Sequence, residues 1–114
     1  MNKIPKTIRE SLSQMAEFHM VLSDVNRLRL IRILATEKDV TVGDLAKRLG
    51  ITQPAVSQHL RILKMIGLLV PDRQGNRTIY RIDIKCLEKF RNLENEMYDV
   101  VLRACEECGP KEAK

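Results

Sequence analysis

A run of polar side chains at helical spacing occupies residues 52–64 and contains the residue types that bind bases and phosphates. Its members are Thr52, Gln53, Ser57, Gln58, His59, Arg61 and Lys64. The amides and hydroxyls can donate and accept hydrogen bonds at base edges, the two cations suit phosphate oxygens, and the imidazole suits either task. The spacing predicts a helix face that reads nucleic acid, although such a face alone is also typical of a solvated helix.

A second group of cations follows in a short loop. Arg73 and Arg77 flank the pair Gly75-Asn76, which is typical of a tight hairpin turn. From Lys47 to Arg81 the chain carries seven Lys or Arg residues and a single acid, and the formal net charge of the whole chain is +5. This clustering indicates one anion-binding face with nucleic acid as the first candidate. On charge alone, a solvated basic surface is an equal alternative.

Two predicted helices precede the polar run. The positions Ile8, Leu12, Met15, His19 and Leu22 recur at helical spacing and predict a first amphipathic helix near residues 8–22. A second helix is expected to begin after an N-cap at Ser23 or Asp24 and to end near Thr36.

Two further helices form a pair around a tight turn. The first is expected to begin at Thr41, with Asp44 completing a capping box, and to end at Gly50. Thr52 as N-cap and Pro54 in the first turn then open the helix that carries the reading residues. Its buried side is predicted to hold Val56, Leu60, Leu63 and Ile66, and Gly67 ends it.

The remaining elements predict the rest of the fold. Strand-like runs at 68–70 and 78–82 enclose the basic loop, and a last helix is expected from about 83 to 107, terminated by Gly109-Pro110. The expected fold class is mostly α with a small β-hairpin wing, in the order α-α-α-α-β-β-α. A winged helix-turn-helix of this kind places its second helix in the major groove and its hairpin on the flanking backbone or minor groove. Turn, hairpin and local charge together favour DNA reading.

Four segments resemble the ArsR/SmtB repressors, in register over roughly residues 18–82. They are Asn26-Arg27-Leu28-Arg29-Leu30-Ile31, Val42-Gly43-Asp44-Leu45-Ala46, the stretch 49–60, and Gly67-Leu68-Leu69. The resemblance implies a homodimer through the first and last helices that represses its own operon and releases DNA when an inducer binds. It also implies a recognition helix from Gln53, with reading positions at Gln53, Ser57, Gln58 and His59, and a wing formed by Arg73 to Arg77. A dimer on a palindromic operator would place its recognition helices about 34–36 Å apart.

The chain departs from the family at the positions where its members bind metals. Many arsenic, cadmium or lead sensors carry Cys-Val-Cys where this chain has Thr41-Val42-Gly43. The positions of the zinc ligands on the last helix fall at Ile84, Cys86, Met97 and Val100, which cannot make a nitrogen and oxygen site.

Three cysteines offer a different sensing chemistry. Cys105 and Cys108 are three residues apart and share a helix face, whereas Cys86 lies nineteen residues before Cys105, nearly 30 Å away along a continuous helix. Antiparallel packing of two last helices would bring Cys86 of one protomer to the pair of the other. We expect that site to bind a thiophilic inducer such as arsenite, cadmium, lead or mercury. The alternatives are thiol-redox or reactive-sulfur sensing, which the adjacent Glu106 and Glu107 disfavour, and thiols without a role.

Length and composition exclude several classes of protein. A chain of 114 residues fits a single domain, 1–114, with an N-terminal arm at 1–7 and a C-terminal tail at 109–114. An odd number of cysteines, no membrane-length apolar run and no export segment predict a cytoplasmic protein without membrane contact. No Gly-rich phosphate loop or paired-acid cluster appears, so we expect no enzyme activity.

The alternative to a repressor is a winged-helix module that binds protein or RNA and has no inducer. Aromatic residues make up 4% of the chain, and Tyr80 is the only one in the basic segment. Because stacking of unpaired bases needs aromatic platforms, double-stranded DNA is the preferred partner.

Overall fold

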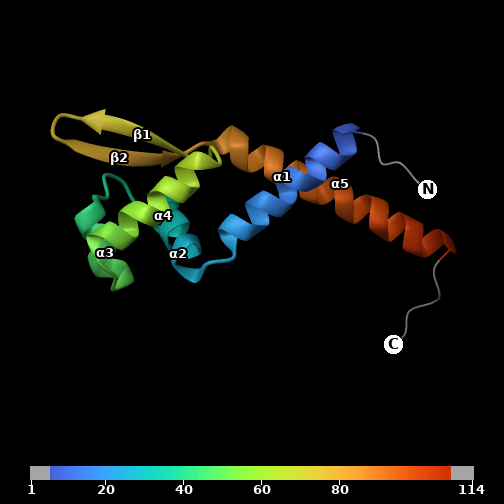
Figure 1. The fold of residues 1–114 in the computed structure, drawn as a ribbon, viewed down its shortest axis with the longest axis horizontal. Coiled ribbons are helices and arrows are strands. Elements are labelled where there is room, and N and C mark those ends of the chain that lie inside the picture. The colour runs from blue at the N-terminus through green and yellow to red at the C-terminus, as the bar shows by residue number, and fades with distance from the viewer. Residues whose placement is uncertain (1–5, 109–114) are drawn as a thin grey trace.

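The computed structural model describes residues 6–108 except for the side chain of Cys108. The elements are α1 (Lys6–Leu22), α2 (Val25–Thr36), α3 (Val42–Leu49), α4 (Gln53–Met65), β1 (Leu69–Gln74), β2 (Arg77–Ile82) and α5 (Ile84–Cys108). The order of helices and strands predicted from the sequence is confirmed (Figure 1). The predicted terminator Gly109-Pro110, the tail and residues 1–5 of the arm lie outside the described residues, whereas Lys6 and Thr7 belong to α1 rather than to an arm.

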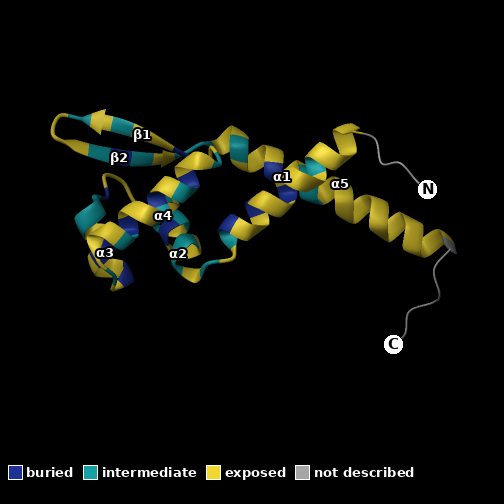
Figure 2. Cartoon of the chain, in the orientation of Figure 1, coloured by how far each residue is buried: buried dark blue, intermediate teal, exposed yellow. Residues whose placement is uncertain are grey.

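The helix-turn-helix body and the hairpin form one end of the molecule, and α1 with α5 extends away from it (Figure 1). Seven fully buried side chains from α2, α3, α4 and the entry to the hairpin at residues 68–69 form the centre of the core. They are Leu30, Leu45, Val56, Leu60, Leu63, Leu68 and Leu69. Figure 2 shows buried positions in the helices of the body, while the C-terminal half of α5 is exposed. Within residues 6–108, none of the helices combines the length and apolar character that a bilayer-spanning segment requires.

The helix ends follow the capping residues that the sequence contains. Asp24 caps α2 by accepting a hydrogen bond from the Arg27 amide, and Thr41 with Asp44 forms the predicted capping box of α3. Gly50 ends α3 with a φ of 71°, a left-handed conformation that glycine adopts without a steric penalty. The short turn between α3 and α4 is therefore fixed by local chemistry.

The buried face of α1 differs from the predicted stripe. Met15, Phe18 and Val21 are buried, whereas Ile8 and Leu12 are exposed. The side chain of His19 is 54% exposed and pairs with Glu94 at 3.0 Å. Packing against α5 selects this face, because the Phe18 ring stacks on Phe90 with centroids 4.1 Å apart.

The wing is longer than predicted. β1 and β2 pair antiparallel from Leu69↔Ile82 to Gln74↔Arg77, so the strands continue through residues that we expected in the loop. A two-stranded sheet has an open edge on each strand, where charged residues and Pro71 are tolerated. The predicted turn at Gly75-Asn76 is confirmed.

Candidate DNA interface

Helix α4 is held by its apolar face and by its N-terminal cap. Val56, Leu60 and Leu63 are buried, and the Thr52 hydroxyl accepts a hydrogen bond from the Ala55 amide at 3.2 Å. Ile66, predicted to be buried on the same side, is partly exposed and lies just beyond the helix. With one face fixed in the core, the opposite face of α4 points away from the body.

The exposed face of α4 carries most of the predicted reading residues. Those exposed are Thr52, Gln53, Ser57, Gln58, Arg61 and Lys64. At 3.6 residues per turn, residues 53, 57, 61 and 64 form one stripe, and Gln58 lies beside it. Amide and hydroxyl groups therefore share one surface with two cations.

His59 lies apart from this stripe. Its ring is half-buried, and Nδ1 is 3.2 Å from Nη1 of Arg27 on α2. The structure thus directs the imidazole toward α2 rather than grouping it with the exposed reading residues.

Two arginines of α2, which the sequence marked only as part of the family resemblance, hold the helix-turn-helix. Arg27 reaches α4 through His59, whereas Arg29 donates to the carbonyl oxygens of Arg48 at 2.9 Å and of Leu49 at 3.5 Å. These carbonyls end α3, where a cation is favourable. Arg48 also forms an ion pair with Glu37. The dense arginine pattern of α2 was the available sequence signal, but it did not identify these partners.

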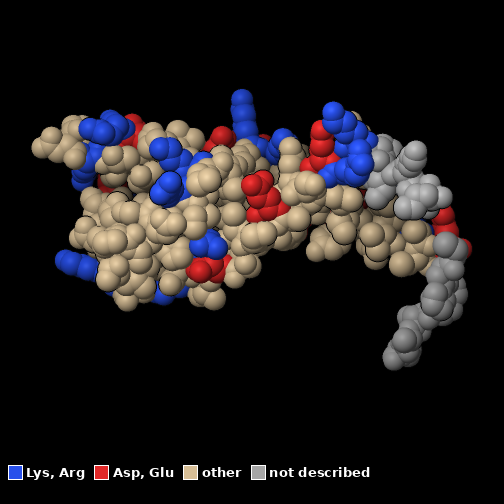
Figure 3. Space-filling model, viewed as in Figure 1, with Lys and Arg blue, Asp and Glu red and all other residues tan. Residues whose placement is uncertain are grey.

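The wing presents cations whose charge is not locally neutralised. Asp72 accepts hydrogen bonds from Arg81 Nε at 2.9 Å and Nη2 at 2.7 Å, and Arg81 holds the pKa of this carboxyl below its usual value. Arg73, Asn76 and Arg77 are exposed, and within residues 6–108 neither of these two arginines has an ion-pair partner. Figure 3 shows Lys and Arg gathered over this hairpin end.

The cysteines are widely separated within the chain. The Cys86 thiol is half-buried, and Sγ lies 3.7 Å from the Ile66 carbonyl oxygen at the end of α4. Burial raises the pKa of the Cys86 thiol. Cys105 is exposed, and the side chain of Cys108 lies outside the described part. In that part, no group of three or more His, Cys, Asp or Glu side chains is arranged to hold a metal ion.

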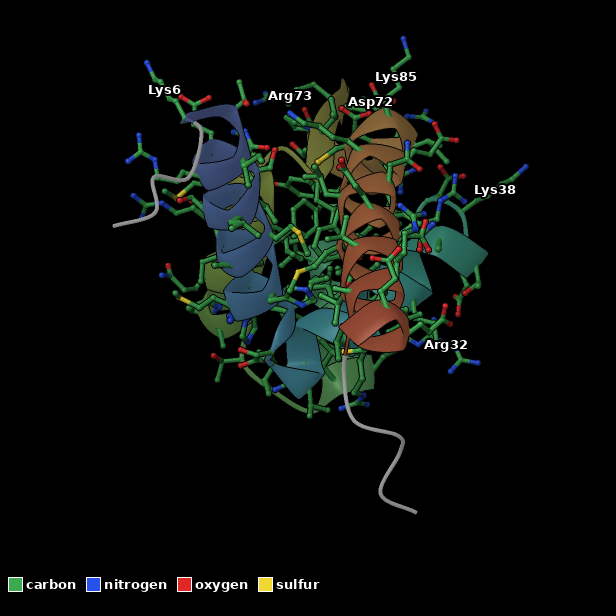
Figure 4. The ribbon with its side chains drawn as sticks, turned by 90° about the vertical axis from the view of Figure 1, so that its right-hand side faces the viewer. Lys6, Arg32, Lys38, Asp72, Arg73 and Lys85 are labelled. Atoms are coloured by element: carbon green, nitrogen blue, oxygen red, sulfur yellow. The ribbon has the colours of Figure 1, made fainter. Side chains whose placement is uncertain are left out.

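An open apolar groove of about 500 Å³ lies between α1 and the C-terminal half of α5. Its apolar lining residues are Ile8, Leu12, Met15, Leu93, Met97, Val100 and Val101. Figure 4 looks onto this end of the molecule and shows α1 and α5 side by side, with their side chains between them. Of the stripe predicted for α1, Ile8, Leu12 and Met15 therefore line this groove, whereas His19 pairs with Glu94 and Leu22 packs against the core.

Residues 24–69 match the family described as "Bacterial regulatory protein, arsR family". Over 91 residues the chain is 33% identical to a protein of Synechocystis sp. named "Transcriptional repressor SmtB homolog", and the alignment spans 79% of this chain and 68% of the relative. The chain belongs to the ArsR family.

Another curated relative and a solved structure agree with this family. The chain is 29% identical over 90 residues to the "Arsenical resistance operon repressor" of Escherichia coli, spanning 73% of this chain and 77% of that protein. The "ArsR-like Transcriptional Regulator from Rhodococcus sp. RHA1" superposes with a TM-score of 0.70 at 26% identity, covering 90% of this chain and 99% of that one.

This ArsR-family chain is a DNA-binding transcription regulator with a winged helix-turn-helix fold, as the sequence predicted. The family consists of regulators rather than enzymes, in agreement with the expectation for this chain. Thr41, one of the positions where the resemblance places a thiolate ligand in metal sensors, here caps α3.

Proposed function

We propose that this regulator is a homodimeric repressor that binds a palindromic operator in the cytoplasm and is released by a thiophilic metal or metalloid bound at cysteines of α5. The observation that carries the DNA-binding part is the exposed face of α4. It combines amide and hydroxyl groups with Arg61 and Lys64, which have no ion-pair partner within residues 6–108. Groups of this kind suit base edges and phosphates in a major groove.

Each part of the surface has a distinct role in this proposal. Gln53, Ser57 and Gln58 contact base edges, while Thr52, Arg61 and Lys64 contact the backbone. The wing residues Arg73, Asn76 and Arg77 reach the flanking backbone or minor groove. His59, which we first expected at a base or phosphate, supports α4 from behind.

The groove between α1 and α5 supports a dimer as the active form. Its apolar lining is open to solvent in the single chain, and Met97, Val100 and Val101 are each 45–56% exposed. A further row of exposed apolar residues on α5 consists of Ile84, Leu87, Tyr98 and Leu102. Such contiguous apolar surface marks an interaction site, and the proposed occupant is α1 and α5 of a second copy.

Val101→Glu is expected to convert the dimer to monomer. A carboxylate placed in an apolar interface must be desolvated, so we expect the dimer dissociation constant to rise by about two orders of magnitude. Val70→Glu on β1 is the matched control, because Val70 and Val101 are both 47% exposed. Sedimentation equilibrium measures the dimer dissociation constant of each variant. Equal dissociation constants for Val101→Glu and Val70→Glu would place the interface elsewhere.

The operator geometry follows from the two-fold axis. Hydroxyl-radical footprinting on the DNA upstream of the coding region is expected to show two protected half-sites about 34–36 Å apart. Protection of one half-site at saturating protein would count against a dimer on a palindrome.

The proposed inducer site uses the sulfurs of two protomers. Thiolates favour arsenite, cadmium, lead or mercury, and the described residues of one chain do not assemble such a set. A route to DNA release is available at Cys86, because its sulfur lies against the Ile66 carbonyl where α4 ends. A ligand that draws Sγ away from this carbonyl would change the support of the recognition helix.

Replacing all three cysteines by serine is expected to abolish release of operator by arsenite or cadmium while leaving DNA affinity unchanged. Because the pKa of the Cys86 thiol is raised and Cd²⁺ displaces the thiol proton, cadmium should be a more potent inducer of the unsubstituted protein at pH 8 than at pH 6. Anaerobic fluorescence anisotropy on a labelled operator measures both effects. Release that survives the triple substitution would refute every cysteine-based mechanism.

The same assay separates the alternatives. Release by peroxide or persulfide, but not by metal ions under anaerobic conditions, would favour thiol-redox or reactive-sulfur sensing. Failure to prefer any duplex would favour a winged-helix protein-interaction module without an inducer.

A further inference from the structure

A single arginine of α2 joins three helices at the back of the recognition helix. The side chain of Arg27 is 15% exposed. Its Nε donates to the Val21 carbonyl oxygen of α1 at 2.6 Å, and its Nη1 lies 3.2 Å from His59 Nδ1 on α4. The same Nη1 is 3.9 Å from the carboxylate of Asp24, the N-cap of α2. One guanidinium therefore links the end of α1 to the middle of α4.

The chemistry of this contact fixes the state of the imidazole. An arginine side chain has donors and no acceptor, so Nδ1 of His59 must supply the lone pair and the ring proton must reside on Nε2. Protonating the ring would remove the acceptor and place a second cation beside the guanidinium. Among the described residues, the charged groups that act on this ring are Arg27 and Asp24. Within residues 6–108, no ion pair joins it to a charged group of α3 or the wing.

We propose that Arg27 is a positioning residue for DNA binding, which holds α4 to the C-terminal end of α1 through a neutral His59 acceptor. The inference rests on the proposed role of α4 as the reading helix. Because α1 belongs to the proposed dimer interface, this contact couples the arrangement of the two protomers to the position of α4 on DNA. Arg27 itself lies behind α4 and touches no base or phosphate.

The first test compares two arginines of the same helix. Arg27→Gln is expected to weaken operator binding about tenfold, the cost of a lost charge-assisted hydrogen bond, without changing the slope of log K against log salt. Arg32→Gln is the control, because Arg32 is exposed and lies at the outer edge of the molecule (Figure 4). We expect its affinity to stay within about twofold of wild type. A salt slope reduced by about one in Arg27→Gln would make Arg27 a phosphate contact and overturn the proposal.

The second test asks whether the acceptor at residue 59 is required. His59→Asn keeps an acceptor near the position of Nδ1 and should bind the operator within about twofold of wild type, whereas His59→Leu lacks an acceptor and should lose about as much affinity as Arg27→Gln. His19→Asn, at the other histidine of the chain, should retain wild-type affinity. Equal losses in His59→Asn and His59→Leu would overturn the role given to the acceptor.

A spectroscopic measurement tests the contact between Arg27 and His59 independently of DNA binding. The ¹⁵N chemical shift of His59 Nδ1 at pH 7.5 should be that of an unprotonated nitrogen in wild type, and the Nε2–H tautomer preference should weaken in Arg27→Gln. A protonated Nδ1 at this pH would refute the contact. Absence of all duplex binding in wild type, with the expected tautomer, would instead refute the proposed function.

Discussion

Replacing Arg61 and Lys64 together by glutamine should weaken operator binding by one to two orders of magnitude at physiological salt. Both side chains are exposed on the proposed reading face of α4. Each cation that neutralises a phosphate releases counterions, so the double variant should also lose about two units from the slope of log K against log salt. Fluorescence anisotropy over a salt series measures both quantities.

A charge-matched variant controls for the change in total charge. Lys6 and Arg9 are exposed on α1, far from the reading face (Figure 1). Lys6→Gln with Arg9→Gln lowers the net charge equally and should leave the salt slope unchanged. If both double variants lost the same affinity, the protein would be responding to its total charge rather than to contacts of α4.

Leu63→Ala should destabilise the fold by about 2–5 kcal/mol, the usual cost of removing a buried leucine side chain. Leu63 is 0% exposed on the inner face of α4. Met65 lies two residues further along the same helix and is 76% exposed, so Met65→Ala should change the free energy of unfolding by less than about 0.5 kcal/mol.

Urea denaturation followed by circular dichroism measures this difference. Both variants must be compared at one protein concentration, because dimerisation adds to the apparent stability. Equal midpoints for Leu63→Ala and Met65→Ala would contradict the assignment of the inner face of α4, and with it the direction of the reading face.

The helix-turn-helix was predictable because its signals are local. Thr41 with Asp44 and Thr52 with Pro54 mark two helix starts, and Gly50 marks the end between them. Helical periodicity then assigned Val56, Leu60 and Leu63 to the core. Once one face of α4 was assigned to the core, the exposed polar stripe followed from helix geometry alone.

The packing face of α1 was not predictable in the same way. Its sequence offers two overlapping stripes, and the one ending in His19 and Leu22 fitted the helical spacing as well as the one through Phe18. The choice depends on Phe90, more than seventy residues away in the sequence, whose ring stacks on Phe18. Helical periodicity contains no information about such a partner.

The roles of individual polar side chains were the least predictable part of the site. His59 falls between reading residues in the sequence, yet its ring contacts Arg27, 32 residues earlier. Cys86 lies about one helical turn before Phe90, but its contact with the Ile66 carbonyl depends on how α4 meets α5. The DNA-contact and cysteine assignments remain predictions.

The most direct test of the central claim is the affinity of the purified protein for the duplex upstream of its own coding region. A scrambled duplex of equal length and composition serves as the reference, at about 0.15 M salt. If α4 reads base edges, binding to the upstream duplex should be at least a thousandfold tighter. Equal affinity for the two duplexes, or binding to neither, would contradict the assignment of α4 as a sequence-reading helix.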